Sequence, residues 1–130
     1  MRNFSVPTGQ RTCFVDITSD VSRAIRECGV SEGLAVVFVS HTTAGVTINE
    51  NADPSVRRDI IAHLEKAVPD QGDYDHAEGN SPAHIKASMM GSSVTVIVAN
   101  GKPVLGTWQA IYLCEFDGPR TRNVFVEVRG

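Results

Sequence analysis

Residues 34–50 are the part of the chain that most constrains its fold. The run Leu34–Val39 is the most apolar in the first half of the sequence, which is typical of a central strand covered on both faces. The next ten residues, His41–Glu50, also read as extended, yet they include a histidine, hydroxyls, an amide and a carboxylate. A strand that only filled a core would not need these groups. The sequence therefore predicts a strand that carries a polar site beside the core.

Composition limits the class of protein. A chain of 130 residues, 42% hydrophobic and 21% charged, is typical of one globular domain over residues 1–130. The net charge of −3 argues against broad nucleic-acid binding but is compatible with a small local anion site. No apolar run approaches the ~20 residues that cross a bilayer, so no membrane association is expected. The three cysteines form no C-x-x-C pair, which favours buried, reduced thiols and a cytoplasmic location.

The order of expected elements predicts an α+β fold. Strands are expected at 10–18, 34–40, 41–50, 93–98, 104–116 and 123–128, with an Asn100-Gly101 hairpin turn. Helices are expected from about residue 19 to Gly29, from Asp53-Pro54 to Pro69, and from Ser81-Pro82 to Gly91. Sheet segments at both ends with helices between them indicate α+β rather than alternating β and α units.

Several polar residues could carry chemistry. They are His41, Asn49, Glu50, Asp53, His63, His76, Glu78, His84, Gln109, Glu115, Arg120 and Arg122. Asp53 is explained equally well as a helix cap, and His63 as a solvated histidine at the edge of an apolar stripe. His76 and His84 are spaced so that both can face one cavity, although eight residues is not a defined metal motif.

Glu115 shares strand parity with Ile111 and Leu113, so its carboxylate is predicted to lie on an apolar face and to need a partner. Arg120 and Arg122, just past the next turn, are the nearest candidates. Either Glu115 forms a structural ion pair, or it orients one arginine of an anion site. No nucleophilic triad, phosphate loop or dinucleotide motif is present. The residues alone therefore predict a polar pocket and no defined reaction.

The motifs nevertheless form a recognisable set. They are His41–Ala44, Asn49–Pro54, Val68–Asp70, Tyr74–His76, Ala83–Ser88, Gly106–Gln109, Glu115 and Gly118–Arg122. In this order, over about residues 12–128, the chain resembles the YjbQ family, the secondary thiamine-phosphate synthases. The resemblance implies a mixed or antiparallel β-sandwich-like sheet with helices clustered on one side. It also implies a homotrimer.

The resemblance further implies a transferase that joins hydroxymethylpyrimidine diphosphate to thiazole phosphate and releases pyrophosphate. Catalytic roles are then expected for His41, Asn49, Glu50, His84 and Glu115. Substrate and phosphate contacts are expected from Thr42, Thr43, Trp108, Gln109, Arg120 and Arg122. A divalent metal, Mg or Zn, is expected on His41, His76 and His84. The alternatives are a trimeric protein that binds a metal or a small phosphorylated ligand without this activity, and a metal-dependent hydrolase.

Overall fold

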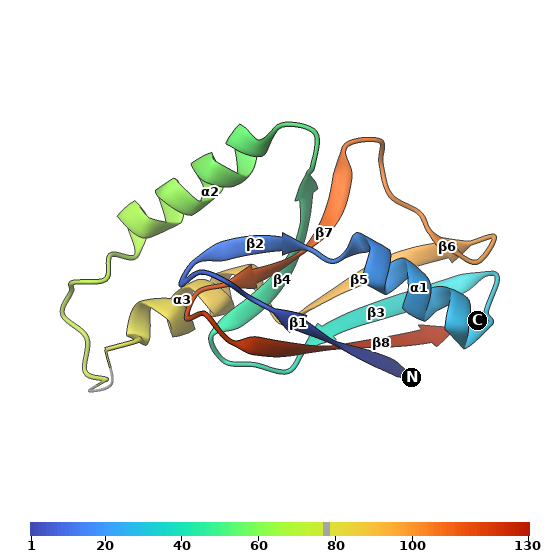
Figure 1. The fold of residues 1–130 in the computed structure, drawn as a ribbon, viewed down its shortest axis with the longest axis horizontal. Coiled ribbons are helices and arrows are strands. Elements are labelled where there is room, and N and C mark those ends of the chain that lie inside the picture. The colour runs from blue at the N-terminus through green and yellow to red at the C-terminus, as the bar shows by residue number, and fades with distance from the viewer. Residues whose placement is uncertain (77–78) are drawn as a thin grey trace.

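The computed structural model describes residues 1–76 and 79–130 (Figure 1). Its strands there are β1 (Arg2–Pro7), β2 (Cys13–Asp16), β3 (Gly33–Val39), β4 (Ala44–Glu50), β5 (Ser93–Ala99), β6 (Lys102–Pro103), β7 (Gln109–Glu115) and β8 (Thr121–Arg129). Its helices are α1 (Thr18–Cys28), α2 (Pro54–Ala67) and α3 (Ser81–Met90). The α+β class expected from the sequence is confirmed. No helix in the described ranges is long and apolar enough to cross a membrane.

Two antiparallel sheets form the body of the molecule. The larger has the order β1-β8-β3-β5-β6, and the smaller has the order β2-β7-β4. One apolar core contains residues from both sheets, such as Val37 of β3 and Val46 of β4, together with Val21 and Ile25 of α1. Alternation along each strand supplies these side chains, because successive residues point to opposite faces.

A second apolar cluster lies on the other face of the small sheet. Phe14, Tyr112 and Phe116 from the sheet contact residues of α2 and α3, including Leu64 and Ala87. Figure 1 shows α3 lying close to β4, whereas α2 stands away from the larger sheet. The small sheet is therefore covered on both faces, and α3 is held beside the start of β4.

Local signals set most of the element ends as predicted. The Asp53 carboxylate accepts a hydrogen bond from the Ser55 backbone N–H at 2.9 Å, and Pro54 occupies the first turn of α2. Gly29 ends α1 in the left-handed conformation, with φ of 74°. Asn100 and Gly101 both have positive φ and connect β5 to β6.

The prediction that residues 34–40 form a strand covered on both faces is wrong within the single chain. Ala35, Val37 and Val39 of β3 are buried, but Leu34, Val36 and Phe38 are 51%, 40% and 43% exposed. The alternating exposure shows that the second face of β3 carries an apolar stripe that nothing in the described chain covers.

The expected single strand from Val104 to Phe116 begins later than predicted, because residues 104–108 are not in a strand and β7 covers only Gln109–Glu115. β6 ends at Pro103 in the large sheet, and β7 begins at Gln109 in the small one. Between them the Gln109 N–H donates to the Gly106 carbonyl at 3.0 Å, and the Gly106 N–H donates to Gln109 Oε1 at 2.8 Å. This local turn redirects the chain. Strand β1, which pairs with β8 at the edge of the large sheet, was not predicted.

Candidate functional site

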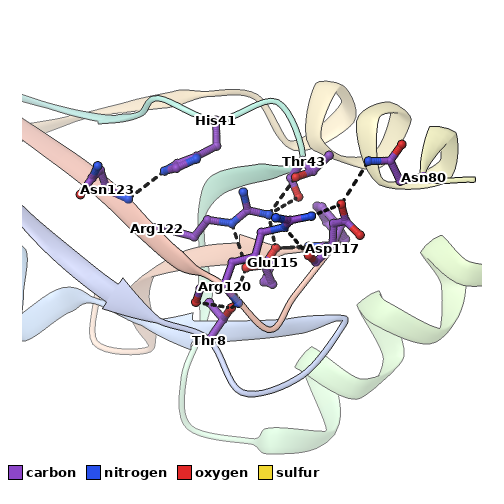
Figure 2. Close-up of polar contacts among 10 residues, drawn as sticks. Thr8, His41, Thr43, Asn80, Glu115, Asp117, Arg120, Arg122 and Asn123 are labelled. Atoms are coloured by element: carbon purple, nitrogen blue, oxygen red, sulfur yellow. Dashed lines mark hydrogen bonds and ion pairs between the residues drawn. The ribbon is translucent and has the colours of Figure 1, made fainter. Parts of the chain in front are cut away.

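Glu115 is the centre of a buried polar network at the end of β7. Its Oε1 accepts hydrogen bonds from Arg122 Nε at 2.8 Å and from Thr8 Oγ1 at 2.7 Å. Its Oε2 accepts from Arg122 Nη2 and from the backbone N–H groups of Phe116 and Asp117. Arg122 Nη2 also donates to Thr43 Oγ1 at 2.8 Å, so the guanidinium lies between Thr43 and Glu115 (Figure 2).

This network shows that Glu115 forms a buried ion pair with Arg122, and the alternative that Glu115 orients an arginine of an anion site stays a prediction. Burial raises the pKa of Glu115, but hydrogen bonds from Arg122, Thr8 and the Asp117 N–H outweigh burial and lower it below its usual value. Arg122 is only 4% exposed, and its Nε and Nη2 donate to Glu115 and Thr43, so these two nitrogens are already engaged within the protein. The exposed Arg120 instead pairs with Asp117.

His41 lies just before β4, in residues 41–43, which are not part of a strand. Its Nε2 accepts a hydrogen bond from the Asn123 backbone N–H at 2.8 Å (Figure 2). Burial and then the charge of Arg122 lower the pKa of His41, while the more weakly felt Glu115 raises it. The imidazole is therefore neutral near pH 7, with Nε2 as acceptor and the proton on Nδ1.

A cavity of ≈ 520 Å³ lies between this segment and the second half of α3. The described residues that line it are His41, Thr42, Ala44, His84, Ala87, Ser88, Gly91 and Ser92. Gly45 permits the close approach of α3, because a Cβ there would lie 2.7 Å from the Gly91 carbonyl oxygen and 3.0 Å from Met90 Cβ. The Val46 N–H also donates to the Gly91 carbonyl, which fixes the end of α3 against β4.

His84 also borders a second hollow, of ≈ 430 Å³, on the side of the loop before α3. This hollow is lined by Asp73, Tyr74, Asp75, His76, Ser81, His84 and Ile85. The rings of His76 and His84 meet edge to face with centroids 5.4 Å apart. The structure thus brings these two histidines together as the sequence predicted, and places His84 between two hollows.

The expected metal cluster of His41, His76 and His84 is not formed by the described residues, among which no three His, Cys, Asp or Glu side chains come together as a metal site. His41 also has no free lone pair in its neutral form, because Nε2 accepts from Asn123 and Nδ1 carries the proton. Glu78, another candidate, lies outside the described residues.

Four other predicted site residues lie at the far end of the small sheet. Glu50 pairs with Gln109 where β4 ends, and β4 alone extends for about 20 Å at ~3.3 Å per residue. Asn49 Oδ1 accepts from the Glu50 N–H, Gln109 closes the turn described above, and Trp108 is 62% exposed. The expectation that His41–Glu50 forms one wall of a single site is therefore wrong, because its two ends lie far apart.

Sequence reasoning identified His84 on the α3 side of the cavity but gave no role to Ser88 or Ser92. Ser88 follows His84 by four residues, so both lie on the same face of the helix, and this spacing was a usable signal. The Ser88 hydroxyl donates to the His84 carbonyl at 2.9 Å, which leaves its oxygen as an acceptor. Ser92 is the second residue after the end of α3 at Met90. The contact between His41 and Asn123 joins residues 82 apart and has no local signature.

Comparison with known proteins places the chain in a family. A family model described as UPF0047 protein YjbQ-like matches residues 2–130. The chain belongs to the YjbQ family. UPF0047 protein MJ1081 of Methanocaldococcus jannaschii is 52% identical over 127 residues, covering 98% of this chain and 92% of that protein. UPF0047 protein YugU of Bacillus subtilis is 45% identical over 131 residues, covering 100% and 99%.

Solved structures of the YjbQ family share the fold. A family member from Clostridium acetobutylicum, described as an uncharacterized conserved protein, is 59% identical with a TM-score of 0.97, covering 99% of this chain and 100% of that one. A YbjQ-like protein of unknown function from Sulfolobus solfataricus is 32% identical with a TM-score of 0.93, covering 98% and 94%.

These findings correct the expected activity. YjbQ relatives carry the name UPF0047, and the Sulfolobus solfataricus structure is described as one of unknown function, so none of them supports thiamine-phosphate synthesis. The residues agree with this correction. Arg122, which was expected to hold the substrate phosphates, is buried against Glu115 and does not line the cavity.

Proposed function

We propose that the chain binds a small phosphorylated molecule in the cavity between His41 and His84. The observation that carries the proposal is the chemistry of the lining. The lining includes two imidazoles and the hydroxyls of Thr42 and Ser92, whereas the Ser88 hydroxyl already donates to the His84 carbonyl. No carboxylate is among the described residues that line the cavity. A phosphate offers oxygen acceptors for such donors and would be repelled by a carboxylate.

The electrostatics of the cavity favour an anion. The charge of Arg122 lowers the pKa of His41 more than the charge of Glu115 raises it, which supports a preference for an anion beside His41. The C-terminal end of α3 opposes an anion, with a helix-dipole term of about 0.3–1 kcal/mol. Each hydrogen bond to a charged acceptor contributes about 1.5–3 kcal/mol, so two such donors outweigh the helix end.

The experiment is a titration of the protein with inorganic phosphate, followed through the imidazole resonances by ¹H–¹⁵N NMR. We expect the signals of His41 and His84 to shift together and saturate. His84→Ala and His41→Gln should each weaken binding by about tenfold or more, because each removes a donor to a charged oxygen. In the His41→Gln variant the new amide oxygen can still accept the Asn123 N–H, so that variant should stay folded.

The matched control is His63→Asn. His63 is an exposed histidine on α2 and lines neither hollow beside His84. Its resonances in the wild type should not move with phosphate, and its replacement should leave the affinity unchanged. Equal shifts at all histidines, or unchanged affinity in the His41 and His84 variants, would overturn the proposal.

Three further expectations stay predictions: that the chain is an enzyme, that it uses Mg or Zn, and that it forms a homotrimer. The exposed stripe of Leu34, Val36 and Phe38 supports self-association, because contiguous exposed apolar patches usually mark interfaces. Light scattering separates a 14.0 kDa monomer from an assembly of three chains. A monomer at micromolar concentration would contradict the trimer.

A further inference from the structure

A crevice between the first turns of α2 and strand β2 lies apart from the cavity beside His41. Its volume is ≈ 230 Å³, and it is lined by Gln10, Cys13, Phe14, Pro54, Arg57, Arg58 and Ile61. Phe14, Pro54 and Ile61 give it an apolar wall, and two guanidinium groups give it a positive one. None of these residues lines the cavity beside His41, so the two sites are independent.

Arg57 is held in place without using its hydrogen-bonding edge. Its Cζ lies 5.3 Å from the centre of the Tyr112 ring, and the Tyr112 hydroxyl donates to the Glu50 carbonyl at 3.0 Å. Stacking on an aromatic ring engages the face of a guanidinium and leaves the N–H groups in its plane available. Within residues 1–76 and 79–130, those N–H groups contact no carboxylate and make no hydrogen bond.

Arg58 adds a second positive charge at the mouth of the crevice. It is exposed and forms no ion pair with any described carboxylate, although its charge reaches Asp53. Asp53 itself is held by Ser55, which donates both its backbone N–H and its hydroxyl to the Asp53 carboxylate. The Asp53 carboxylate offsets part of the Arg58 charge, but the described residues that line the crevice include two guanidinium groups and no carboxylate.

The other polar residues that line the crevice are Gln10 and Cys13, although the charges of Asp16 and Glu50 reach Tyr112 beside Arg57. Burial raises the pKa of the Cys13 thiol, with a smaller contribution from the charge of Glu115, so Cys13 is neutral near pH 7. Gln10 carries an amide that can donate. The crevice is smaller than the ~300–1,000 Å³ typical of drug-sized ligands, which limits the occupant to a compact molecule.

We propose that this crevice binds a small organic carboxylate whose flat apolar body lies against Phe14 and Ile61. The edge of Arg57 matches the two oxygens of a planar carboxylate, and Arg58 supplies the second charge. The apolar wall distinguishes such a molecule from a bare inorganic anion, because burying the apolar surface of the ligand against it contributes favourable binding free energy.

Three probes test this assignment by calorimetry and by backbone amide NMR on the intact chain. Benzoate has the charge and the flat body, benzamide has the body alone, and inorganic phosphate has the charge alone. We expect benzoate to bind with shifts confined to β2 and the first half of α2. Benzamide lacks the negative charge and phosphate lacks the flat apolar body. Each should therefore bind at least about tenfold more weakly than benzoate at these residues.

Two variants locate the benzoate site. Arg57→Gln should weaken benzoate binding by about tenfold or more. Arg58→Gln, at an exposed position that the fold does not need, should weaken it less. The control is Arg23→Gln, which removes an exposed arginine of α1 that pairs with Asp20. Absence of benzoate binding, equal binding of benzamide, or unchanged affinity in both Arg57 and Arg58 variants would overturn the proposal.

Discussion

Replacing Arg122 with methionine is expected to lower the free energy of unfolding by about 3–5 kcal/mol, because it leaves the buried Glu115 carboxylate without its cation. The methionine keeps much of the side-chain volume, so the loss reports the missing charge and hydrogen bonds rather than a cavity. Thr8 and two backbone N–H groups still donate to Glu115, but neutral donors do not replace a guanidinium. Urea denaturation at pH 7 measures the change.

Arg120→Met is the matched control. Arg120 forms a similar ion pair with Asp117, three residues earlier in the chain, but its side chain is 53% exposed. Exposed pairs contribute about 0–1 kcal/mol, so this variant should remain close to the wild type. Similar losses of stability in Arg122→Met and Arg120→Met would contradict the stabilising role assigned to the buried Glu115–Arg122 pair. In the double variant Glu115→Gln/Arg122→Met, part of the lost stability should return, since no unpaired charge remains.

The pH dependence gives an independent check on the same pair. In the wild type the pKa of Glu115 is lower in the folded state than in the unfolded state. This stabilisation is present above the unfolded pKa of ~4.3 and is lost as the pH falls through the folded value. In Arg122→Met, burial without the cation should raise the folded pKa. The difference in free energy of unfolding between the wild type and the variant should therefore be largest near pH 7. It should shrink at lower pH, as Glu115 takes up a proton.

Replacing Gly45 with alanine is expected to displace the C-terminal half of α3 and to weaken phosphate binding beside His84. The added Cβ would lie 2.7 Å from the Gly91 carbonyl oxygen and 3.0 Å from Met90 Cβ, and the first of these is backbone that can move only with the helix. Overpacking of this kind costs about 1–3 kcal/mol. Thermal unfolding and phosphate titration measure the two effects.

Gly9→Ala is the control for this substitution. A Cβ at Gly9 would meet nothing within 4 Å, and its φ is not in the left-handed region. Its stability should stay within about ±0.5 kcal/mol of the wild type, with unchanged phosphate binding. If Gly45→Ala were equally neutral, the close approach of α3 to β4 would not be what shapes the cavity.

The features that the sequence predicted correctly are those with a local cause. Asp53-Pro54 and Gly29 mark helix ends through their own backbone preferences, and Asn100-Gly101 marks a hairpin in the same way. The burial of Glu115 followed from strand parity, and its nearby arginine partner followed from the need to compensate a buried charge.

The features that the sequence missed depend on contacts between distant segments. Nothing near His41 indicates that its Nε2 accepts from Asn123, and this contact decides which nitrogen carries the proton. The passage of the chain from the large sheet at Pro103 to the small sheet at Gln109 depends on which distant strands β6 and β7 pair with. Asn49 and Glu50 were grouped with His41 because they are close in sequence. Strand β4 is extended, however, so its length separates His41 at one end from Asn49 and Glu50 at the other.

The network around Glu115 also bears on how the chain folds. Thr8 and Glu115 are 107 residues apart, and Thr43 and Arg122 are 79 apart. Glu115 therefore gains Thr8, and Arg122 gains Thr43, only when distant parts of the chain have met, whereas the Arg122 and backbone N–H partners of Glu115 are local. Contacts of such long sequence separation slow folding, because the closure of a large loop precedes the interactions that stabilise it. A chain cut before Arg122 would leave Glu115 without its cation, so fragments that lack the last strand should not reach the native packing.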